Sequence, residues 1–229
     1  MKNNIFKTAV LTALILTTLQ ATAQDFDKSQ YCPLTKGIRL EYANFNKKGE
    51  PENIYLMEVS RIEGVFEKGE LTFEQTFLTC DRKPLIKDNV IPMDIKTGDG
   101  PTQSAMSGAG RIMKIQDYIS KGDASSLPAE LKVGMTIPDG HIDVQVDNFK
   151  STIHVFDRKV MDKKEITTEA GTFDCFLIHE KQTTKTVFSK EEIVESWYTK
   201  GIGVVKQQVY NHKGVLQRTQ VLTNVSIHN

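Results

Sequence analysis

The sequence predicts an all-β fold: a strongly curled antiparallel sheet that forms a barrel or half-barrel, with an irregular or short helical insertion in the middle. Three observations predict it. Apolar and polar residues alternate with period two over most of the chain after residue 24, as in half-buried strands. Turn-forming residues separate these runs at short, regular intervals, as in sandwiches and barrels. No helical pattern is long enough for the crossover helix of a parallel βαβ unit.

The N-terminal part of the predicted sheet is a meander. Three alternating runs predict its strands, at residues 37–45, 53–62 and 70–79. In the first run Ile38, Leu40 and Tyr42 fall on one face and charged residues fall on the other. A segment rich in turn formers separates the first two runs, so we expect a hairpin there.

The middle of the chain is less regular. Residues 96–110 are rich in Gly, Ser and Thr and contain a proline, so we expect a loop. Residues 111–120 have isoleucines at helical spacing but also a β-branched content that fits a strand, and both interpretations stay open. A connector with two prolines and two glycines follows at residues 127–140. We expect this region to cap or plug the sheet.

Alternation returns after the connector and predicts three hairpins. Their turns are expected at residues 169–171, 189–191 and 211–214. The turn sequence YNHKG at residues 210–214 matches FNKKG at residues 45–49. Asn starts such a turn, and Gly takes the left-handed conformation that the loop requires. The match indicates either shared turn chemistry or a duplicated half-barrel.

The N-terminus predicts export. Residues 1–23 combine two lysines, an apolar run at residues 9–19 and a small-x-small site before Gln24, which is the pattern of a secretory signal peptide. A membrane anchor is the alternative, but the apolar run is shorter than the ~20 residues of a span. Since Gln24 is not a cysteine, we expect no lipid attached to an N-terminal cysteine.

Residues 24–229 are expected to form a single β-barrel or half-barrel domain with no transmembrane span after signal cleavage. The expected location is the periplasm or the periplasmic face of the outer membrane, with secretion as a further option. Removing two lysines from 29 basic residues leaves 27 against 29 acidic ones, a net charge of −2. This balance argues against nucleic acid as a partner, because nucleic-acid binding needs a basic surface.

Cysteine usage fits an oxidising compartment. Cys32, Cys80 and Cys175 are an odd number, so at most one internal disulfide forms. A Cys32–Cys80 bond is favoured because it would fasten the N-terminal arm, worth ~4 kcal/mol in the chain-entropy model. Three free, mostly buried thiols are the alternative. Cys175 is predicted to be a free, buried thiol because it shares a strand face with Phe173 and Leu177 and has no C-x-x-C partner.

Motifs for chemistry are missing. The five histidines form no tight ligand pair, and C-x-x-C, G-x-S-x-G, S-x-x-K, G-x-G-x-x-G and the Walker pattern do not occur. The acidic pairs Asp143/Asp147 and Glu192/Glu195 are interpreted as solvated residues. We therefore predict no catalytic, cofactor-binding or metal-binding residues, and we do not expect an enzyme.

Binding is the more natural expectation. A curled antiparallel sheet offers a concave face, so we expect an apolar or amphipathic ligand such as a lipid or lipoprotein, although no ligand-binding residue can be assigned. The alternative is a structural or interaction module with a packed interior that binds another envelope protein. An apolar cavity of ~300–1,000 Å³ would favour the first hypothesis.

Three motifs carry a resemblance to a known family. They are ITTEAGTFDCFLI at residues 166–178, ESWYTKGIGVVKQQVYNHKGVL at residues 195–216 and LPAELKVGMTIPDG at residues 127–140. These segments resemble an exported family of Bacteroides-type bacteria, labelled TapB-like or as a domain of unknown function. The resemblance covers most of residues 127–222 and, more loosely, residues 31–80. It implies a lipocalin-like or lipoprotein-carrier-like barrel or half-barrel, and it supplies no catalytic residues.

Overall fold

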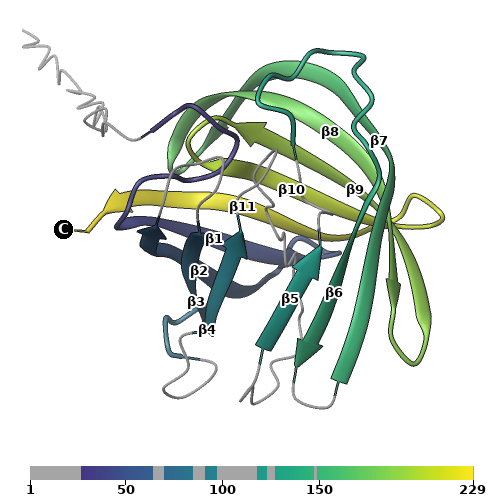
Figure 1. The fold of residues 1–229 in the computed structure, drawn as a ribbon, viewed down its shortest axis with the longest axis horizontal. Coiled ribbons are helices and arrows are strands. Elements are labelled where there is room, and N and C mark those ends of the chain that lie inside the picture. Colours follow the sequence, from purple (N-terminus) through teal and green to yellow (C-terminus); the bar gives the residue numbers. More distant parts are fainter. Residues whose placement is uncertain are drawn as a thin grey trace, which may run out of the picture.

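The computed structural model describes residues 27–63, 70–84, 91–96, 118–122, 127–146 and 149–228. These residues form one antiparallel sheet of eleven strands and no helix (Figure 1), which confirms the all-β prediction. The strands are β1 (Ile38–Asn46), β2 (Pro51–Glu63), β3 (Glu70–Leu78), β4 (Ile91–Lys96), β5 (Tyr118–Gly122), β6 (Gly140–Val146), β7 (Phe149–Thr168), β8 (Gly171–Lys185), β9 (Ser189–Thr199), β10 (Gly203–Asn211) and β11 (Leu216–Ile227).

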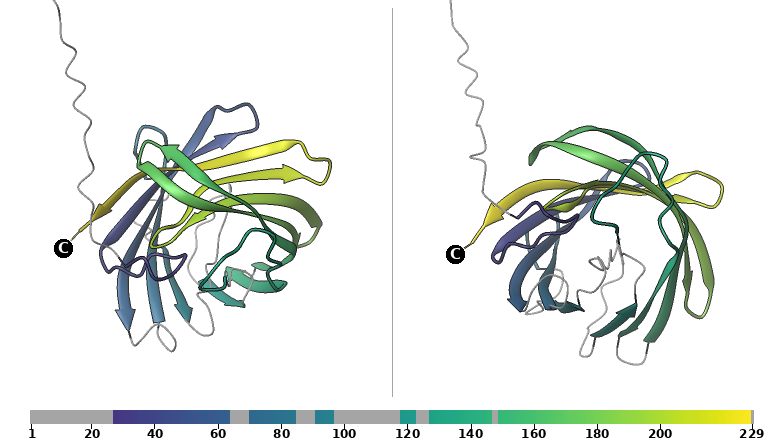
Figure 2. Two further views of the ribbon diagram at one scale, coloured as in Figure 1. Left: turned by 90° about the horizontal axis from the view of Figure 1, so that it is seen from above. Right: turned by 45° about the horizontal axis from the view of Figure 1, so that its top comes forward.

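The sheet has the order β4-β3-β2-β1-β11-β10-β9-β8-β7-β6-β5. Most neighbours in space are neighbours in sequence, and the pairing of β1 with β11 joins the two halves. The sheet bends (Figure 2), and some Cα atoms of the edge strands β4 and β5 come within 8 Å of each other. No ladder joins these two edges within the described residues, so the sheet is open there. Closure and strong curling, as predicted for a barrel, are therefore not confirmed.

Alternation places the apolar side chains as the sequence predicts. Ile38, Leu40 and Tyr42 of β1 are buried. They belong to the same core cluster as the fully buried Leu222, which pairs with Tyr42 from the neighbouring strand β11. Tyr42 also donates a hydrogen bond from its hydroxyl to the Val204 carbonyl at 3.0 Å, which satisfies its buried polar atom. This face of β1, β11 and β10, which carries Leu40 and Leu222, is called the inner face below.

The connector at residues 127–139 supplies a second apolar cluster. Its Leu127, Leu131 and Ile137 are buried against Ile178 and Tyr198 of β8 and β9. Backbone hydrogen bonds tie the connector to β7, including Gly134 N to Val160 O at 2.8 Å. The prolines and glycines that prevent a strand here therefore produce a packed cover over one end of the inner face.

The two matching turn sequences have the same hydrogen bonds. Asn46 Oδ1 accepts from the backbone N–H groups two and four residues later, and Asn211 Oδ1 does the same in its own turn. Gly49 and Gly214 have φ angles of 79° and 75°, the left-handed conformation that glycine adopts without steric cost. Shared turn chemistry is therefore present in both hairpins, and duplication of a half-barrel stays an untested hypothesis.

One predicted turn is in the wrong place. The β8–β9 hairpin turns at residues 186–188, whereas the prediction put the turn at residues 189–191. Lys185 pairs with Ser189, so Ser189 already belongs to β9. Thr186 makes this possible, because its backbone N–H donates to Phe188 O and its hydroxyl accepts from Phe188 N. The polar run after the turn suggested a loop, but it forms the start of a strand.

Several predictions fall outside the described residues. The signal peptide at residues 1–23 does, and so does most of the middle segment, residues 97–117. Strand β5 covers the end of the ambiguous segment at residues 111–120 and favours the strand interpretation for that end. The expected cap or plug formed by the middle segment stays a prediction.

Candidate functional site

Cys175 lies in the hydrophobic core. Its side chain is fully buried in the cluster that contains Trp197 and Ile38. Burial, and to a smaller extent the charge of Asp174, raises the pKa of the Cys175 thiol to about 12. At neutral pH almost none of this thiol is thiolate, the reactive form. Its burial and its raised pKa therefore disfavour a role as a nucleophile, and its inertness to thiol reagents stays a prediction.

The other two cysteines lie in different surroundings. Cys32 is buried, and burial followed by the charge of Asp27 raises the pKa of its thiol to about 12. Cys80 is exposed, and all three cysteines are free thiols in the structure. The N-terminal arm is held by packing and a backbone hydrogen bond, with the Tyr31 ring edge-on to Phe176 and Gln30 O accepting from the Gly201 N–H. The Cys32–Cys80 disulfide stays a prediction.

The histidines lie on different strands, in a turn and beyond the last strand, and two of them form a cross-strand pair. The His179 ring lies 3.4 Å from Glu195, measured from Nδ1 to Oε1. His141 and His154 stack across β6 and β7 with ring centroids 6.0 Å apart, a cross-strand pair that sequence spacing did not reveal. Within the described residues, no three His, Cys, Asp or Glu side chains come together as metal ligands would.

The inner face changes from apolar to polar along its strands. Beyond Tyr42, the next inward position of β1 is Asn44, and beyond Leu222 the next inward position of β11 is Gln220. On β10, Gln207 follows Val205 in the same way and is also buried. We call this set of inward polar side chains the polar row; its members are Asn44, Asn53, Glu192, Ser196, Gln207, Arg218 and Gln220.

Hydrogen bonds join members of the polar row, which come from five neighbouring strands, into separate groups. Gln220 Nε2 donates to Asn44 Oδ1 at 3.0 Å, and Asn44 Nδ2 donates to Asn53 Oδ1 at 2.7 Å. On the other side, Gln207 Nε2 donates to Ser196 Oγ at 2.9 Å. Such amides are costly to bury without partners, so these bonds explain how the sheet tolerates them.

A charged pair completes the row. Arg218 donates to both carboxylate oxygens of Glu192, at 2.9 and 3.3 Å, and Lys190 Nζ lies 2.7 Å from Glu192 Oε1. Burial raises the pKa of Glu192, but the hydrogen bonds and charges of Lys190 and Arg218 outweigh it and lower that pKa overall. The prediction that Glu192 is solvated is wrong, because its side chain is only 5% exposed. Glu195, its predicted partner, faces the other way and is 31% exposed.

A second charged pair lies further along the sheet. Arg158 is buried; its Nε donates to Glu180 Oε2 at 3.0 Å and its NH1 group donates to the Pro138 carbonyl at 3.0 Å. Burial raises the pKa of Glu180 more than the Arg158 charge lowers it. The pair fixes the end of the connector against β7 and β8, so we assign it a structural role.

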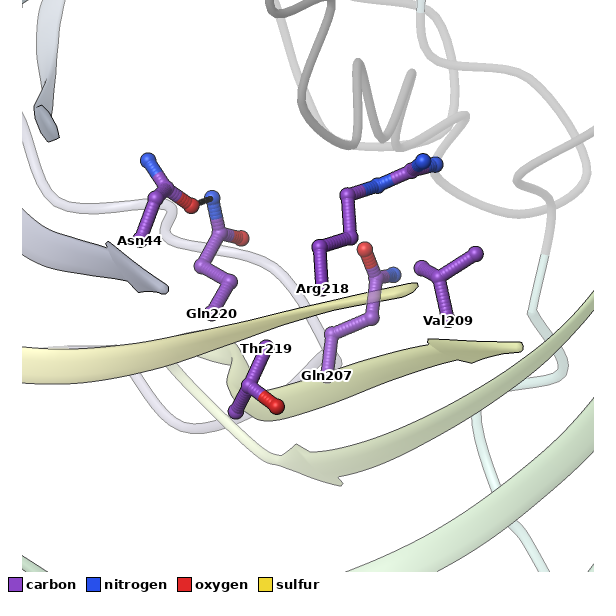
Figure 3. Close-up of a pocket in the computed structure, with 6 residues that line it drawn as sticks. All are labelled: Asn44, Gln207, Val209, Arg218, Thr219 and Gln220. Carbon is purple, nitrogen blue, oxygen red and sulfur yellow. Dashed lines mark hydrogen bonds between the residues drawn. The ribbon is translucent and has the colours of Figure 1, made fainter. Parts of the chain in front are cut away.

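A small hollow opens beside the polar row. It has a volume of about 10 Å³, close to the space of one water molecule, and its lining is mostly polar. In Figure 3 Asn44, Gln207, Arg218 and Gln220 point to one side of the sheet, whereas Thr219 points to the other. Arg218 Nε is buried and finds no hydrogen-bond partner among the described residues. An unpaired buried donor beside a hollow is the kind of group that a ligand or water satisfies.

Aromatic rings adjoin the polar row on the same face. Tyr42 stacks on Tyr55 with centroids 5.7 Å apart, and Tyr55 packs on Phe77 with centroids 5.1 Å apart. Tyr42 and Tyr55 stand two residues from Asn44 and Asn53, so each pair shares a strand face. The inner face therefore places hydrogen-bonding groups next to aromatic rings, of which Tyr42 and Tyr55 are buried.

The family model described as DUF3108-like matches residues 35–222. The chain belongs to the DUF3108-like family. The match spans β1 to β10 and the first part of β11, and it includes every member of the polar row. No curated protein matches the chain.

Solved structures share the fold. One is a protein of Bacteroides fragilis described as exported, with a YmcC-like fold; it is 21% identical with a TM-score of 0.72, over 86% of this chain and 99% of that one. Another is described as a lipoprotein of Parabacteroides distasonis; it is 16% identical with a TM-score of 0.69, over 89% of this chain and 100% of that one. The resemblance to Bacteroides-type exported proteins is thus confirmed at this level, whereas the TapB-like name is not.

The described residues contain no helix with the length and apolar character that crossing a membrane requires.

Proposed function

We propose that this DUF3108-like protein is an exported, non-catalytic binding protein of the cell envelope, and that it takes an amphipathic ligand on the inner face of its sheet. The observation that carries the proposal is the polar row lying beside the aromatic rings of Tyr42, Tyr55 and Phe77 on one face. Small-molecule sites combine apolar surface with a few well-placed polar groups, and this face has both.

Export is supported from two sides. The sequence begins with the pattern of a signal peptide. The two solved structures that share the fold are described as an exported protein and a lipoprotein. Both descriptions belong to those proteins, and they support an envelope location for this chain.

The polar row determines which head group fits. Arg218 Nε has no acceptor within the described part of the chain, and the amide groups of Gln207 and Gln220 line the same hollow. A head group that offers a hydrogen-bond acceptor would satisfy the Arg218 donor. An apolar tail would pack against the neighbouring aromatic rings, of which Tyr42 and Tyr55 are buried until the hollow widens. The hollow is far below the ~300 Å³ of a typical ligand pocket, so binding requires it to widen.

A second candidate function rests on a different observation. Ile38, Leu40 and Leu222 have no exposed surface, so side chains already fill the apolar end of the inner face. A solidly packed face fits an interaction module whose partner is another envelope protein. The two hypotheses differ in whether the protein still carries a small molecule after it is purified from its host.

Native mass spectrometry of the protein purified from its own host tests the proposal. We expect a co-purifying lipid-sized mass on the wild type, less of it on Gln207→Leu and the wild-type amount on Gln208→Leu. Gln208 is the matched control because it is the next residue of β10 and points to the opposite face. A clean mass without ligand, together with an envelope protein recovered in pull-downs, would support the interaction module instead.

A further inference from the structure

The tip of the β8–β9 hairpin carries two exposed apolar side chains. Val187 and Phe188 are 85% and 82% exposed, and they are adjacent in the turn. The turn is ordered by the hydrogen bonds between Thr186 and Phe188, so it holds both side chains at the end of a firm hairpin. Exposing a phenylalanine in this way leaves its apolar surface in water, which is unfavourable unless something covers it.

Two lysines flank this tip. Lys185 and Lys190 are exposed; Lys190 also pairs with Glu192 at 2.7 Å, and the neighbouring Glu191 is exposed too. Three hairpin turns lie at the same end of the sheet, because Asn46 pairs with Arg218 and Asn211 pairs with Glu192. Figure 1 shows the β8–β9 and β10–β11 hairpins projecting from the same side of the molecule. With their flanking strand residues, these turns span residues 46–51, 185–191 and 211–216. Together these segments hold five lysines and two glutamates, a net charge of +3 within a chain whose formal net charge is zero.

We propose that this end of the sheet docks on an anionic lipid bilayer, with Val187 and Phe188 inserted among the head groups and the lysines against the lipid phosphates. The occupant follows from shape and charge. A projecting tip with one aromatic and one aliphatic side chain enters a soft interface, whereas a protein partner would have to offer a matching pocket. Apolar side chains flanked by lysines are the combination that interfacial binding uses, since burial of the apolar side chains and attraction of the lysines to anionic lipid add.

The docking inference stands apart from the proposed ligand site. Val187 and Phe188 lie in the turn, and the polar row lies within the strands, so substitutions at the tip leave the inner face unchanged. Docking on a bilayer is also possible for a protein that carries no ligand. A failure of ligand binding therefore does not decide the docking inference, and the converse also holds.

Co-sedimentation with vesicles tests the inference. The exported, processed form of the protein is used, because an uncleaved leader would bind lipid by itself. We expect binding to phosphatidylglycerol–phosphatidylethanolamine vesicles, weaker binding to phosphatidylcholine vesicles, and weakening with salt. Phe188→Ser should lower the affinity for anionic vesicles on the order of tenfold, from the apolar surface it removes.

Two further variants provide a matched control and a fluorescent probe of insertion. Val133→Ser is the matched control, since Val133 is 56% exposed but lies in the connector, and its binding should equal that of the wild type. In Phe188→Trp, the emission of the introduced indole should shift to shorter wavelength when anionic vesicles are added. The inference is overturned if the wild type ignores anionic vesicles, if Phe188→Ser binds as well as Val133→Ser, or if the tip instead captures a protein partner without binding vesicles.

Discussion

Replacing Glu192 with glutamine probes the charged end of the polar row. The change keeps the shape of the side chain but leaves the Arg218 guanidinium, now 2.9 Å from a neutral amide, without its counter-charge. Breaking a buried pair by removing one partner costs ~3–5 kcal/mol. Glu192 is 5% exposed and Arg218 is 23% exposed, so solvent screens the orphaned charge in part. We therefore expect a loss of about 3 kcal/mol in the free energy of unfolding, or roughly 6–12 °C in Tm for a domain of this size.

Urea and thermal unfolding, followed by circular dichroism, measure this loss. Glu195→Gln is the matched control on the same strand, because its carboxylate is 31% exposed and only 3.4 Å contacts join it to His179 and Tyr210. Exposed pairs of this kind contribute at most about 1 kcal/mol. Equal, small losses in both variants would show that Glu192 is a solvated residue, and the reasoning about the polar row would be refuted.

The remaining predictions concern pH, the thiols and a glycine. The folded-state pKa of Glu192 is lowered from the usual 4.5, so Glu192 adds stability above pH 4.5 that is lost as the pH falls through its folded-state pKa. The difference in unfolding free energy between wild type and Glu192→Gln should therefore close in acid. A difference that stays constant down to pH 3 would contradict this. After reduction of any disulfide, a thiol reagent should label Cys80 rapidly in the native state and leave Cys175 unlabelled until unfolding, as mass spectrometry can show. Rapid labelling of Cys175 would overturn its assignment as an inert core residue. Gly37→Ala should lower the unfolding free energy by more than ~2 kcal/mol, since the added Cβ would lie 2.0 Å from a backbone oxygen. Gly214→Ala has a similar φ but no atom within 4 Å of the added Cβ, so it should lower the unfolding free energy by about 1 kcal/mol. Equal losses in the two variants would refute the steric argument.

The fold was predictable where alternation and turn chemistry agree. Ile38, Leu40 and Tyr42 point inward because period two forces them to one face, and the structure places all three in the core. Asn46 and Asn211 mark their turns because a side-chain oxygen can replace a backbone acceptor. The turn at residues 186–188 was missed because two of its three residues, Val187 and Phe188, are apolar. Local polarity is a poor guide when a threonine provides the turn bonds.

The candidate site was less visible. Gln207 stands at the same strand parity as Val205 and Val209, so the sequence did hold a sign that it points inward. Glu192 likewise shares the parity of Val194, but an isolated acidic residue is normally solvated, and its arginine partner is 26 residues away in sequence. Period two assigns a residue to a face, while the neighbours on that face depend on pairing between β9, β10 and β11, which one sequence does not specify.

Hydrogen–deuterium exchange tests the central claim most directly. The protein would be stripped of bound lipid and then reloaded with the total lipid extract of its host's envelope. Binding on the inner face predicts new protection from exchange in the segments of β1, β10 and β11 around Asn44, Gln207 and Gln220. The variant Gln207→Leu should show no such new protection when lipid is added. Protection confined to the turn at residues 186–188, or no new protection at all, would contradict a ligand site on this face.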